Sequence, residues 1–468
     1  MATTTTRYQR TYSPVDGSLV ATRELASGHA VERALAAAEA AQAAWGETAL
    51  EWRVAVVERM VDALLARTDA IAGELAMQMG RPVRDGPKEI RGGYAERALA
   101  MAELAPETLA DVDVGGAAGA RRILRRRPVG VVLVLAPWNY PFLTAVNAVV
   151  PAILAGNAVV LKHSDQTPLA SERIAEAFAT AGLPDGVLQV LHMNHDTVAD
   201  VIRDERIGYV HFTGSVEGGR AVKRAAAERF IGVGLELGGK DPAYVRADAD
   251  LDQAAAGLVD GAMFNAGQSC CGIERIYVQR ERFDPFVERF LELARAYRLG
   301  DPRDPETTLG PMVRTASAEL ARDHVRDAVA RGAVPLIDPK DFPAAAEGTA
   351  YMAPQVLINV RQNMRVMQEE TFGPVVGIMP VADDDEAVRL MNDSRYGLTA
   401  SVWTADVAAA DRLGSRLATG TCYANRCDYL DPLLPWSGVK DSGHGVSLSR
   451  LGFEPFTRTL ALHLKAPG

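Results

Sequence analysis

The chain has 468 residues, of which 48% are hydrophobic and 24% charged, and its 50 basic and 60 acidic side chains give a formal charge of −10. Such a length exceeds what one hydrophobic core usually serves and predicts two or three domains. The composition is that of a globular protein, and the excess of acidic residues argues against a nucleic-acid partner.

The apolar segments argue against secretion and against a membrane span. Residues 1–17 contain no apolar core of the kind that secretory signals carry, so we expect a cytoplasmic protein. The longest apolar stretch, Ala145 to Leu161, is interrupted by Pro151 and by the Gly156-Asn157 pair, which predicts a helix, a turn and a strand. We expect no membrane partner, and thiols rather than disulfides for the four cysteines.

Hydrophobic periodicity gives the order of the elements. Two amphipathic helices are expected at His29 to Trp45 and at Glu51 to Thr68. From residue 129, apolar strands beginning near 129, 157, 187, 207 and 232 alternate with helices. A second pattern of strands and helices starts near Asp241. Alternation of this kind predicts βαβ units and parallel sheets, so we expect two α/β domains, the first a doubly wound nucleotide-binding domain.

Polar clusters follow four strands of the first predicted sheet. They are "LAPWNYP" (135–141), "LKHSDQTP" (161–168), "HFTGS" (211–215) and "LELGGK" (235–240). The carboxyl ends of parallel strands share one edge of a sheet, where ligands bind in open α/β folds. The "TGS" turn could bind a phosphate at a helix start or could simply cap that helix. There is no GxGxxG or P-loop motif to decide between these alternatives.

Lys162 and Asp165 are the candidates for ribose binding. A carboxylate accepts hydrogen bonds from a 2′-hydroxyl and repels a 2′-phosphate, which favours NAD over NADP. The alternative is a surface ion pair of little energetic value.

The segment "NAGQSCCGIERIYV" (265–278) places Cys270 beside Cys271. No further Cys or His follows at a metal-ligand spacing, so we expect no metal. Taken alone, the doublet most often signals buried structural thiols. The alternative is a nucleophile, which the tight turn at Gly267 could present close to backbone N–H groups.

Several motifs together resemble the aldehyde dehydrogenase superfamily, of the NAD(P)-dependent, non-phosphorylating, hydrolytic type. "PWNYP", "AGNAVVLKHSDQTP", "FTGS", "LELGGKDP", "NAGQSCC", "EETFGPV" and "PWSGVKDSGHG" occur in the order and approximate spacing of that family, and the resemblance covers nearly the whole chain.

The resemblance implies a role for particular residues. Cys270 is the nucleophile, Glu236 the general base, whose pKa a partly apolar site would raise, and Asn139 the side-chain donor to the oxyanion. The implied cofactor-binding residues are Pro137 and Trp138, Lys162 and Asp165 at the adenosine ribose, Gly214 and Ser215 at the pyrophosphate, and Glu370 and Phe372 at the nicotinamide ribose.

The chain also departs from the family pattern. Asp165 stands where the family more often has Glu, and Trp436-Ser437 replaces the commoner Phe-Gly. The distinctive segment Tyr423 to Pro435 borders the substrate tunnel in the family, so Arg426 to Asp428 either shape substrate selectivity or pack as a loop.

The implied fold has three parts. They are a Rossmann-like cofactor domain (1–108 and 129–237), an α/β catalytic domain (238–440) and a small β oligomerisation extension (109–128 and 441–468). The extension predicts a homodimer or a homotetramer, because its edge strands need covering.

The implied activity is oxidation of an aldehyde to the carboxylic acid through a thiohemiacetal and a thioester on Cys270, with NAD as the cofactor and NADP as the alternative. Two rivals are a coenzyme A-acylating enzyme and a catalytically silent structural or binding member of the same fold. The sequence does not indicate which aldehyde is the substrate.

Overall fold

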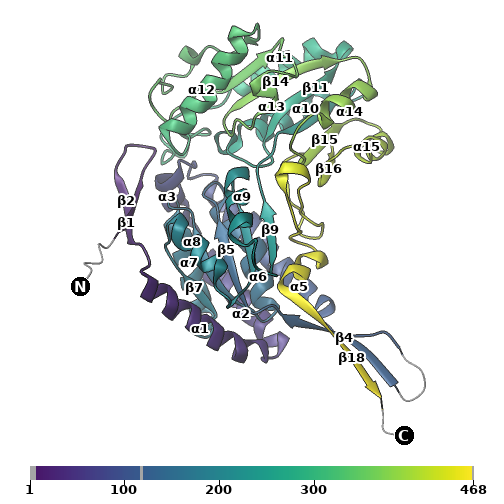
Figure 1. The fold of residues 1–468 in the computed structure, drawn as a ribbon. Coiled ribbons are helices and arrows are strands. Elements are labelled where there is room, and N and C mark those ends of the chain that lie inside the picture. The colour runs from purple at the N-terminus through teal and green to yellow at the C-terminus, as the bar shows by residue number, and fades with distance from the viewer. Residues whose placement is uncertain (1–6, 116–119, 466–468) are drawn as a thin grey trace.

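The computed structural model describes residues 7–115 and 120–465. Figure 1 shows two α/β bodies joined through the chain, with one two-stranded hairpin and one long ribbon projecting from them. The described helices are neither long nor apolar enough to cross a lipid bilayer.

The first body is built on a six-stranded sheet with the order β17-β9-β8-β5-β6-β7. All neighbouring pairs are parallel except β17 with β9. Strand β5 is a run of valine, leucine and alanine, and every one of its residues is buried. Such a sequence is needed because helices cover both faces of the sheet. The strands are β5 (Val131–Ala136), β6 (Ala158–His163), β7 (Leu188–Val190), β8 (Ile207–Thr213), β9 (Gly232–Glu236) and β17 (Gly443–His444).

Helices cover both faces of this sheet (Figure 1). Residue 90 starts one irregular turn, a π-helical segment from Ile90 to Ala95 that runs directly into the next helix. The helices are α1 (Gly28–Gly46), α2 (Leu50–Leu65), α3 (Thr68–Met79), α4 (Gly86–Glu89), α5 (Glu96–Thr108), α6 (Pro141–Leu154), α7 (Pro168–Thr180), α8 (His195–Arg203) and α9 (Val216–Ala225).

The second body is built on a seven-stranded sheet with the order β12-β13-β14-β11-β10-β15-β16, parallel except for β12 with β13. Its strands are β10 (Asp241–Val245), β11 (Ile273–Gln279), β12 (Val334–Pro335), β13 (Gln355–Ile358), β14 (Val375–Val381), β15 (Thr399–Trp403) and β16 (Thr421–Ala424). Its helices are α10 (Leu251–Met263), α11 (Phe283–Arg295), α12 (Thr315–Ala330), α13 (Arg365–Gln368), α14 (Asp384–Asn392) and α15 (Val407–Gly414). Short 3-10 turns lie in this body at Phe264–Gly267, Arg280–Arg282 and Pro339–Asp341, and in the segment that follows it at Lys440–Ser442 and Arg450–Phe456.

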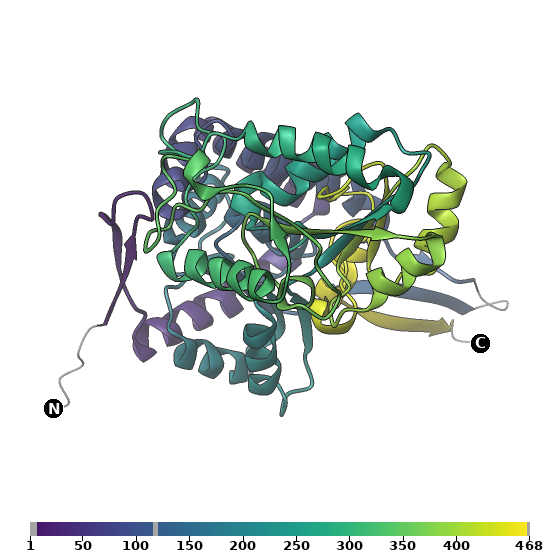
Figure 2. The same cartoon turned by 90° about the horizontal axis from the view of Figure 1, so that it is seen from above.

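Two small antiparallel sheets complete the fold. Strands β1 (Tyr8–Tyr12) and β2 (Leu19–Glu24) form a hairpin that precedes the first of the two predicted helices. Strands β3 (Val112–Asp113), β4 (Ala120–Pro128) and β18 (Thr457–Lys465) form the projecting ribbon, which stands clear of both bodies in Figures 1 and 2.

The predicted α/β fold class is confirmed by these parallel sheets. The domain boundaries remain predictions. We assigned residues 443 and 444 to the oligomerisation extension, but they pair with β9 of the six-stranded sheet. Among the described residues, β18 is the C-terminal strand that belongs to the ribbon.

Candidate functional site

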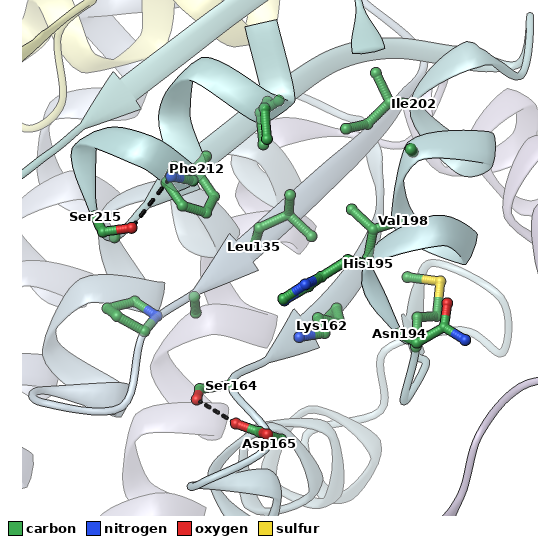
Figure 3. Close-up of a pocket in the computed structure, with 18 of the residues that line it drawn as sticks. Leu135, Lys162, Ser164, Asp165, Asn194, His195, Val198, Ile202, Phe212 and Ser215 are labelled. Atoms are coloured by element: carbon green, nitrogen blue, oxygen red, sulfur yellow. Dashed lines mark hydrogen bonds between the residues drawn. The ribbon is translucent and has the colours of Figure 1, made fainter. Parts of the chain in front are cut away.

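A cavity of about 850 Å³ lies at the carboxyl edge of the six-stranded sheet. It is lined by the ends of β5, β6 and β8, by one side of α8 and of α9, and by the start of β1. Five of the predicted cofactor-binding residues line it: Pro137, Lys162, Asp165, Gly214 and Ser215. Figure 3 shows Lys162, Ser164 and Asp165 near the end of β6 and Ser215 at the start of α9.

The start of α9 has the form of an anion site. Ser215 caps the helix, its Oγ accepting a hydrogen bond from the backbone N–H of Gly218 at 3.1 Å. A Cβ atom on Gly214 or on Gly218 would lie 2.6 Å from the ring of Phe212. The N–H groups of Gly214 and Gly218 already donate to the backbone oxygen of Glu236 and to Ser215, so the N–H groups of Val216 and Glu217 are the ones that a pyrophosphate could use. With Lys162 and Asp165 at the end of β6, the lining has the residue types that a dinucleotide needs.

The two predicted ribose residues differ in burial. Burial lowers the pKa of Lys162, while the nearby charge of Asp165 acts against that effect. Asp165 is largely exposed, and its Oδ1 accepts a hydrogen bond from Nη2 of Arg314 at 3.1 Å. Arg314 belongs to the segment just before α12, and nothing in the sequence pattern pointed to it.

A second cavity, of about 250 Å³, brings Cys270, Cys271 and Glu236 together. Glu236 is the last residue of β9, and the cysteines follow the 3-10 turn that ends at Gly267. Asp428 and Trp436, from the distinctive C-terminal segments, also line this cavity. The fold thus joins residues 34 positions apart in the chain, as the catalytic prediction needs.

The turn before the cysteines has an unusual backbone. Asn265, Ala266 and Gly267 have φ values of 54°, 55° and 67°. A Cβ atom on Gly267 would overlap the carbonyl group of Gly373, so only glycine fits there. The side chain of Asn265 stabilises the turn by donating to the backbone oxygens of Asn139 at 3.1 Å and Gln268 at 3.2 Å. This turn fixes the start of the segment that carries both thiols.

The two neighbouring thiols have different surroundings. The Sγ atom of Cys271 donates a hydrogen bond to Oδ1 of Asp428 at 2.8 Å, and Ser269 donates to the same oxygen at 3.2 Å. A hydrogen bond with Cys270, then burial and the charge of Asp428, raise the pKa of Cys271 well above its ordinary value. Cys270 is only partly buried. The geometry therefore makes Cys270 the better candidate for a reactive thiolate and leaves Cys271 protonated.

Glu236 is held by three neighbours. Its Oε2 accepts a hydrogen bond from Thr213 at 3.0 Å, its Oε1 accepts one from Ser447, and Nε2 of His211 lies 3.7 Å from Oε1. Burial raises the pKa of Glu236, but the charge of His211 and the contacts that His211, Ser447 and Thr213 make with the carboxylate outweigh burial, and the pKa falls below its ordinary value. This direction is opposite to the one that an apolar site would give. Glu236 stays ionised at neutral pH.

The remaining predicted residues lie near the joint between the two sheets. The Nδ2 atom of Asn139 donates to the backbone oxygen of Gln268 at 3.2 Å, so this amide contacts the cysteine segment. The rings of Trp138 and Phe372 meet edge to face with centroids 5.6 Å apart. The Oε1 atom of Glu370 accepts a hydrogen bond from the N–H of Gly239 at 2.9 Å, and burial together with the charge of Glu274 raises the pKa of Glu370 to about 8.

Two buried arginines border the cavity of Cys270 and Glu236, and no sequence motif pointed to either of them. Arg81 is ion-paired with Glu89 and donates to the backbone oxygen of Asn139. Glu89 accepts in turn from the N–H groups of Phe142 at 2.8 Å and Leu143 at 3.2 Å, at the start of α6. The pair thereby fixes the segment that carries Asn139. The second buried arginine is Arg97, in the first turn of α5.

Comparison with known proteins identifies the family. The family model described as "Aldehyde dehydrogenase family" matches residues 1–461. A succinate semialdehyde dehydrogenase of Escherichia coli, named for NAD(P)+, is 34% identical over 450 residues, which are 95% of each chain. A succinate-semialdehyde dehydrogenase of Mycobacterium ulcerans, named for NADP(+), is 34% identical over 453 residues, covering 95% of this chain and 97% of the relative.

Solved structures of aldehyde dehydrogenases resemble this chain over nearly its whole length. An NAD-dependent aldehyde dehydrogenase from Sinorhizobium meliloti superposes with a TM-score of 0.93 at 34% identity, over 99% of this chain and 92% of that one. A succinic semialdehyde dehydrogenase from Streptococcus pyogenes, in complex with NADP+, has a TM-score of 0.93 at 28% identity, over 98% and 100% of the two chains. With a dinucleotide-sized cavity beside a cavity that holds a free thiol and a carboxylate, these matches show that the chain belongs to the aldehyde dehydrogenase family and is an NAD(P)-dependent oxidoreductase that converts aldehydes to carboxylic acids.

Proposed function

We propose that the aldehyde is oxidised through a thioester on Cys270, which is then hydrolysed by water that Glu236 activates. The observation that carries this proposal is that Cys270 and an ionised Glu236 border the same cavity while Cys271 is bound to Asp428. The names of the relatives make succinate semialdehyde the first substrate to test.

In the first step the Cys270 thiolate attacks the aldehyde carbon, a C–S bond forms, and the carbonyl oxygen becomes an oxyanion. Asn139 has two amide hydrogens, and only one of them is needed for the bond to Gln268. The second hydrogen, with the backbone N–H of Cys270, would stabilise the oxyanion, and one such donor is typically worth ~3 kcal/mol.

Lys162, Asp165 and Ser215 would hold the adenosine ribose and the pyrophosphate of the dinucleotide, and Glu370 and Phe372 would hold its nicotinamide ribose. When bound, the dinucleotide would supply the acceptor for the hydride of the aldehyde carbon. The product on Cys270 is a thioester. Glu236 then takes a proton from water, and the hydroxyl oxygen attacks the thioester carbon. The C–S bond breaks to release the carboxylic acid, and the proton on Glu236 passes to the sulfur of Cys270, which restores the ionised Glu236 and leaves Cys270 as the thiol.

The experiment is a rate measurement on the purified protein. A panel of aldehydes with NAD should give NADH, detected by its absorbance, without added coenzyme A. An absolute requirement for coenzyme A would favour the acylating rival, which has no need of an ionised Glu236. No NADH with any aldehyde would favour the catalytically silent rival.

We further propose NAD as the preferred cofactor and test it with Asp165→Ser. Asp165 places a carboxylate in the dinucleotide cavity, and its removal also frees Arg314 to attract a 2′-phosphate. We expect kcat/KM for NADP to rise about 10-fold, or ~1.4 kcal/mol, while kcat/KM for NAD falls. Steady-state kinetics with both cofactors measure this, with the exposed Asp196→Ser as control. An unchanged NADP-to-NAD ratio would rule out Asp165 as the selectivity residue.

Ser447→Ala tests the state of Glu236. Ser447 donates to Oε1 of Glu236 and lowers its pKa, so removing the hydroxyl should raise that pKa. A hydrogen bond to a charged group is worth ~1.5 kcal/mol, which corresponds to about one pKa unit. Deacylation requires the ionised form of Glu236, so the acid limb of the pH profile of the deacylation rate should move to a higher pH by about one unit. The control is Ser449→Ala, whose hydroxyl accepts from the N–H of Leu451; an acid limb that stays in place in Ser447→Ala would contradict this account.

The ribbon and the thiol chemistry of Cys270 support two further proposals. We propose a homodimer or homotetramer assembled through β4 and β18, where the side chains of Leu124, Leu460 and Leu464 are exposed. We also propose a cytoplasmic location, where the thiol of Cys270 would stay reduced.

A further inference from the structure

Arg81 and Arg97 border the catalytic cavity under different electrostatic conditions. Both are at least 96% buried, with relative exposures of 2% and 4%. Arg81 is neutralised by Glu89. Arg97 has no carboxylate within ion-pair distance among the described residues, so its charge faces the cavity without a partner. Burying a charge without a partner costs folding free energy and is therefore uncommon unless a ligand of opposite charge binds to it.

The hydrogen bonds of Arg97 leave part of its guanidinium group free. Its Nη1 atom donates to the backbone oxygen of Leu143 at 2.6 Å and to Oδ1 of Asn147 at 3.2 Å. In the described part of the chain, Nε and Nη2 donate to no acceptor, yet neither belongs to the fully buried atoms without partners. These donors therefore open to the cavity that Arg97 lines. Free guanidinium N–H groups match the two oxygens of a carboxylate.

The charge of Arg97 acts at the reacting groups. Burial lowers the pKa of Arg97 to about 10, and the charge of Glu236 acts against that effect, so Arg97 stays cationic at neutral pH. Arg97 lines the same cavity as Cys270. The nearby carboxylate of Asp428 is already committed to hydrogen bonds from Cys271 and Ser269. An incoming anion is the remaining partner for Arg97.

We propose that Arg97 determines substrate selectivity by binding the terminal carboxylate of a short semialdehyde whose other end reaches Cys270. The inference rests on the proposed function of Cys270. It assigns to α5 a specificity residue for an anionic substrate, in a cavity of about 250 Å³ that suits a short aliphatic chain.

Other charges in the cavity point to the opposite substrate class. Asp85, Glu96, Asp260 and Asp428 also line it and would favour a cationic aldehyde. Asp85 is ion-paired with Lys88 at 2.7 Å, and Glu96 accepts a hydrogen bond from the hydroxyl of Tyr429 at 3.1 Å. Because Asp85 and Glu96 already have partners, fewer carboxylates are free to bind a cationic aldehyde than the list of cavity residues suggests. Preference for a cationic aldehyde is therefore one of the outcomes that the test can give.

The test compares three aldehydes of similar length: succinate semialdehyde, butanal and 4-trimethylammoniobutanal. We expect the wild type to prefer succinate semialdehyde. Arg97→Met should lower its kcat/KM with succinate semialdehyde about 10- to 100-fold, mainly through KM, and change kcat/KM with butanal less than about threefold. Arg97→Lys should recover part of the loss, because it restores the charge without the planar fork. The control, Arg91→Gln, removes an exposed charge from the adjoining turn and should affect no aldehyde selectively.

A binding measurement separates this inference from the proposed function. Titration calorimetry of succinate into Cys270→Ala and into Cys270→Ala with Arg97→Met requires no turnover, and we expect the second protein to bind about 10-fold more weakly or worse. Three results would overturn the assignment of Arg97. One is equal binding of succinate by both proteins, and another is an equal loss of kcat/KM with succinate semialdehyde and with butanal in the folded Arg97→Lys variant. The third is a wild-type preference for the cationic aldehyde. Loss of all turnover in the wild type, with succinate binding that depends on Arg97, would instead overturn only the proposed function.

Discussion

Replacing Cys270 by alanine is expected to lower kcat/KM for aldehyde oxidation by about 10⁴-fold or more, since removal of a nucleophile eliminates the covalent route. Both kcat and the pre-steady-state release of NADH should fall, because oxidation of the aldehyde carbon follows formation of the C–S bond. Dinucleotide binding should persist, because the cavity of Lys162 and Ser215 does not include Cys270. Stopped-flow absorbance and cofactor titration measure these quantities.

Cys271→Ala is the matched control for this variant. Cys271 is buried, and its thiol is a hydrogen-bond donor to Asp428, so its loss should affect packing and leave most of the turnover. We expect activity within about 10-fold of the wild type, the range that a lost buried hydrogen bond allows. Full activity in Cys270→Ala with loss of activity in Cys271→Ala would exchange the roles of the two thiols.

Glu236→Gln is expected to separate the two halves of the reaction. Thiolate attack and oxidation do not need Glu236, so one equivalent of NADH should form per site in a burst. Hydrolysis of the thioester does need a base, and a missing general base costs about 10² to 10⁴-fold, so the steady-state rate should fall by that factor. Glutamine keeps the acceptor oxygen for Thr213 or Ser447, which preserves the local packing.

Glu228→Gln provides the control for Glu236→Gln. Glu228 is exposed, lies beyond the end of α9 and lines neither cavity, so its replacement should leave both phases unchanged. A normal steady-state rate in Glu236→Gln would show that another group activates the water. Loss of the burst as well would assign Glu236 to the first half of the reaction.

The candidate site could be predicted in outline because it lies at the ends of recognisable strands. Glu236 closes an apolar strand, and Ser215 follows another, so the topology of a parallel sheet brings them to one edge whatever the details of packing. The positions of Cys270 and Asn139 came from the resemblance of their motifs. The structure adds the contact between the Asn139 amide and Gln268, which joins the two motifs directly.

The parts that were not predicted depend on tertiary packing. Arg81 lies in the loop between α3 and α4, and Arg97 lies in the first turn of α5, and neither position carries a local pattern that marks a buried residue. The packing of α5 against α6 buries Arg97. The pKa of Glu236 was also misjudged, because the effects of His211 and Ser447 come from residues 25 and 211 positions away along the chain. Local sequence does not record such approaches.

The most direct test of the account is peptide mass mapping of Glu236→Gln after incubation with succinate semialdehyde and NAD. The account predicts an acyl group in thioester linkage on Cys270 and unmodified Cys271, with no adduct when NAD is omitted and the hemiacetal is allowed to reverse. An acyl group on Cys271, or no adduct on either cysteine while NADH is formed, would contradict it.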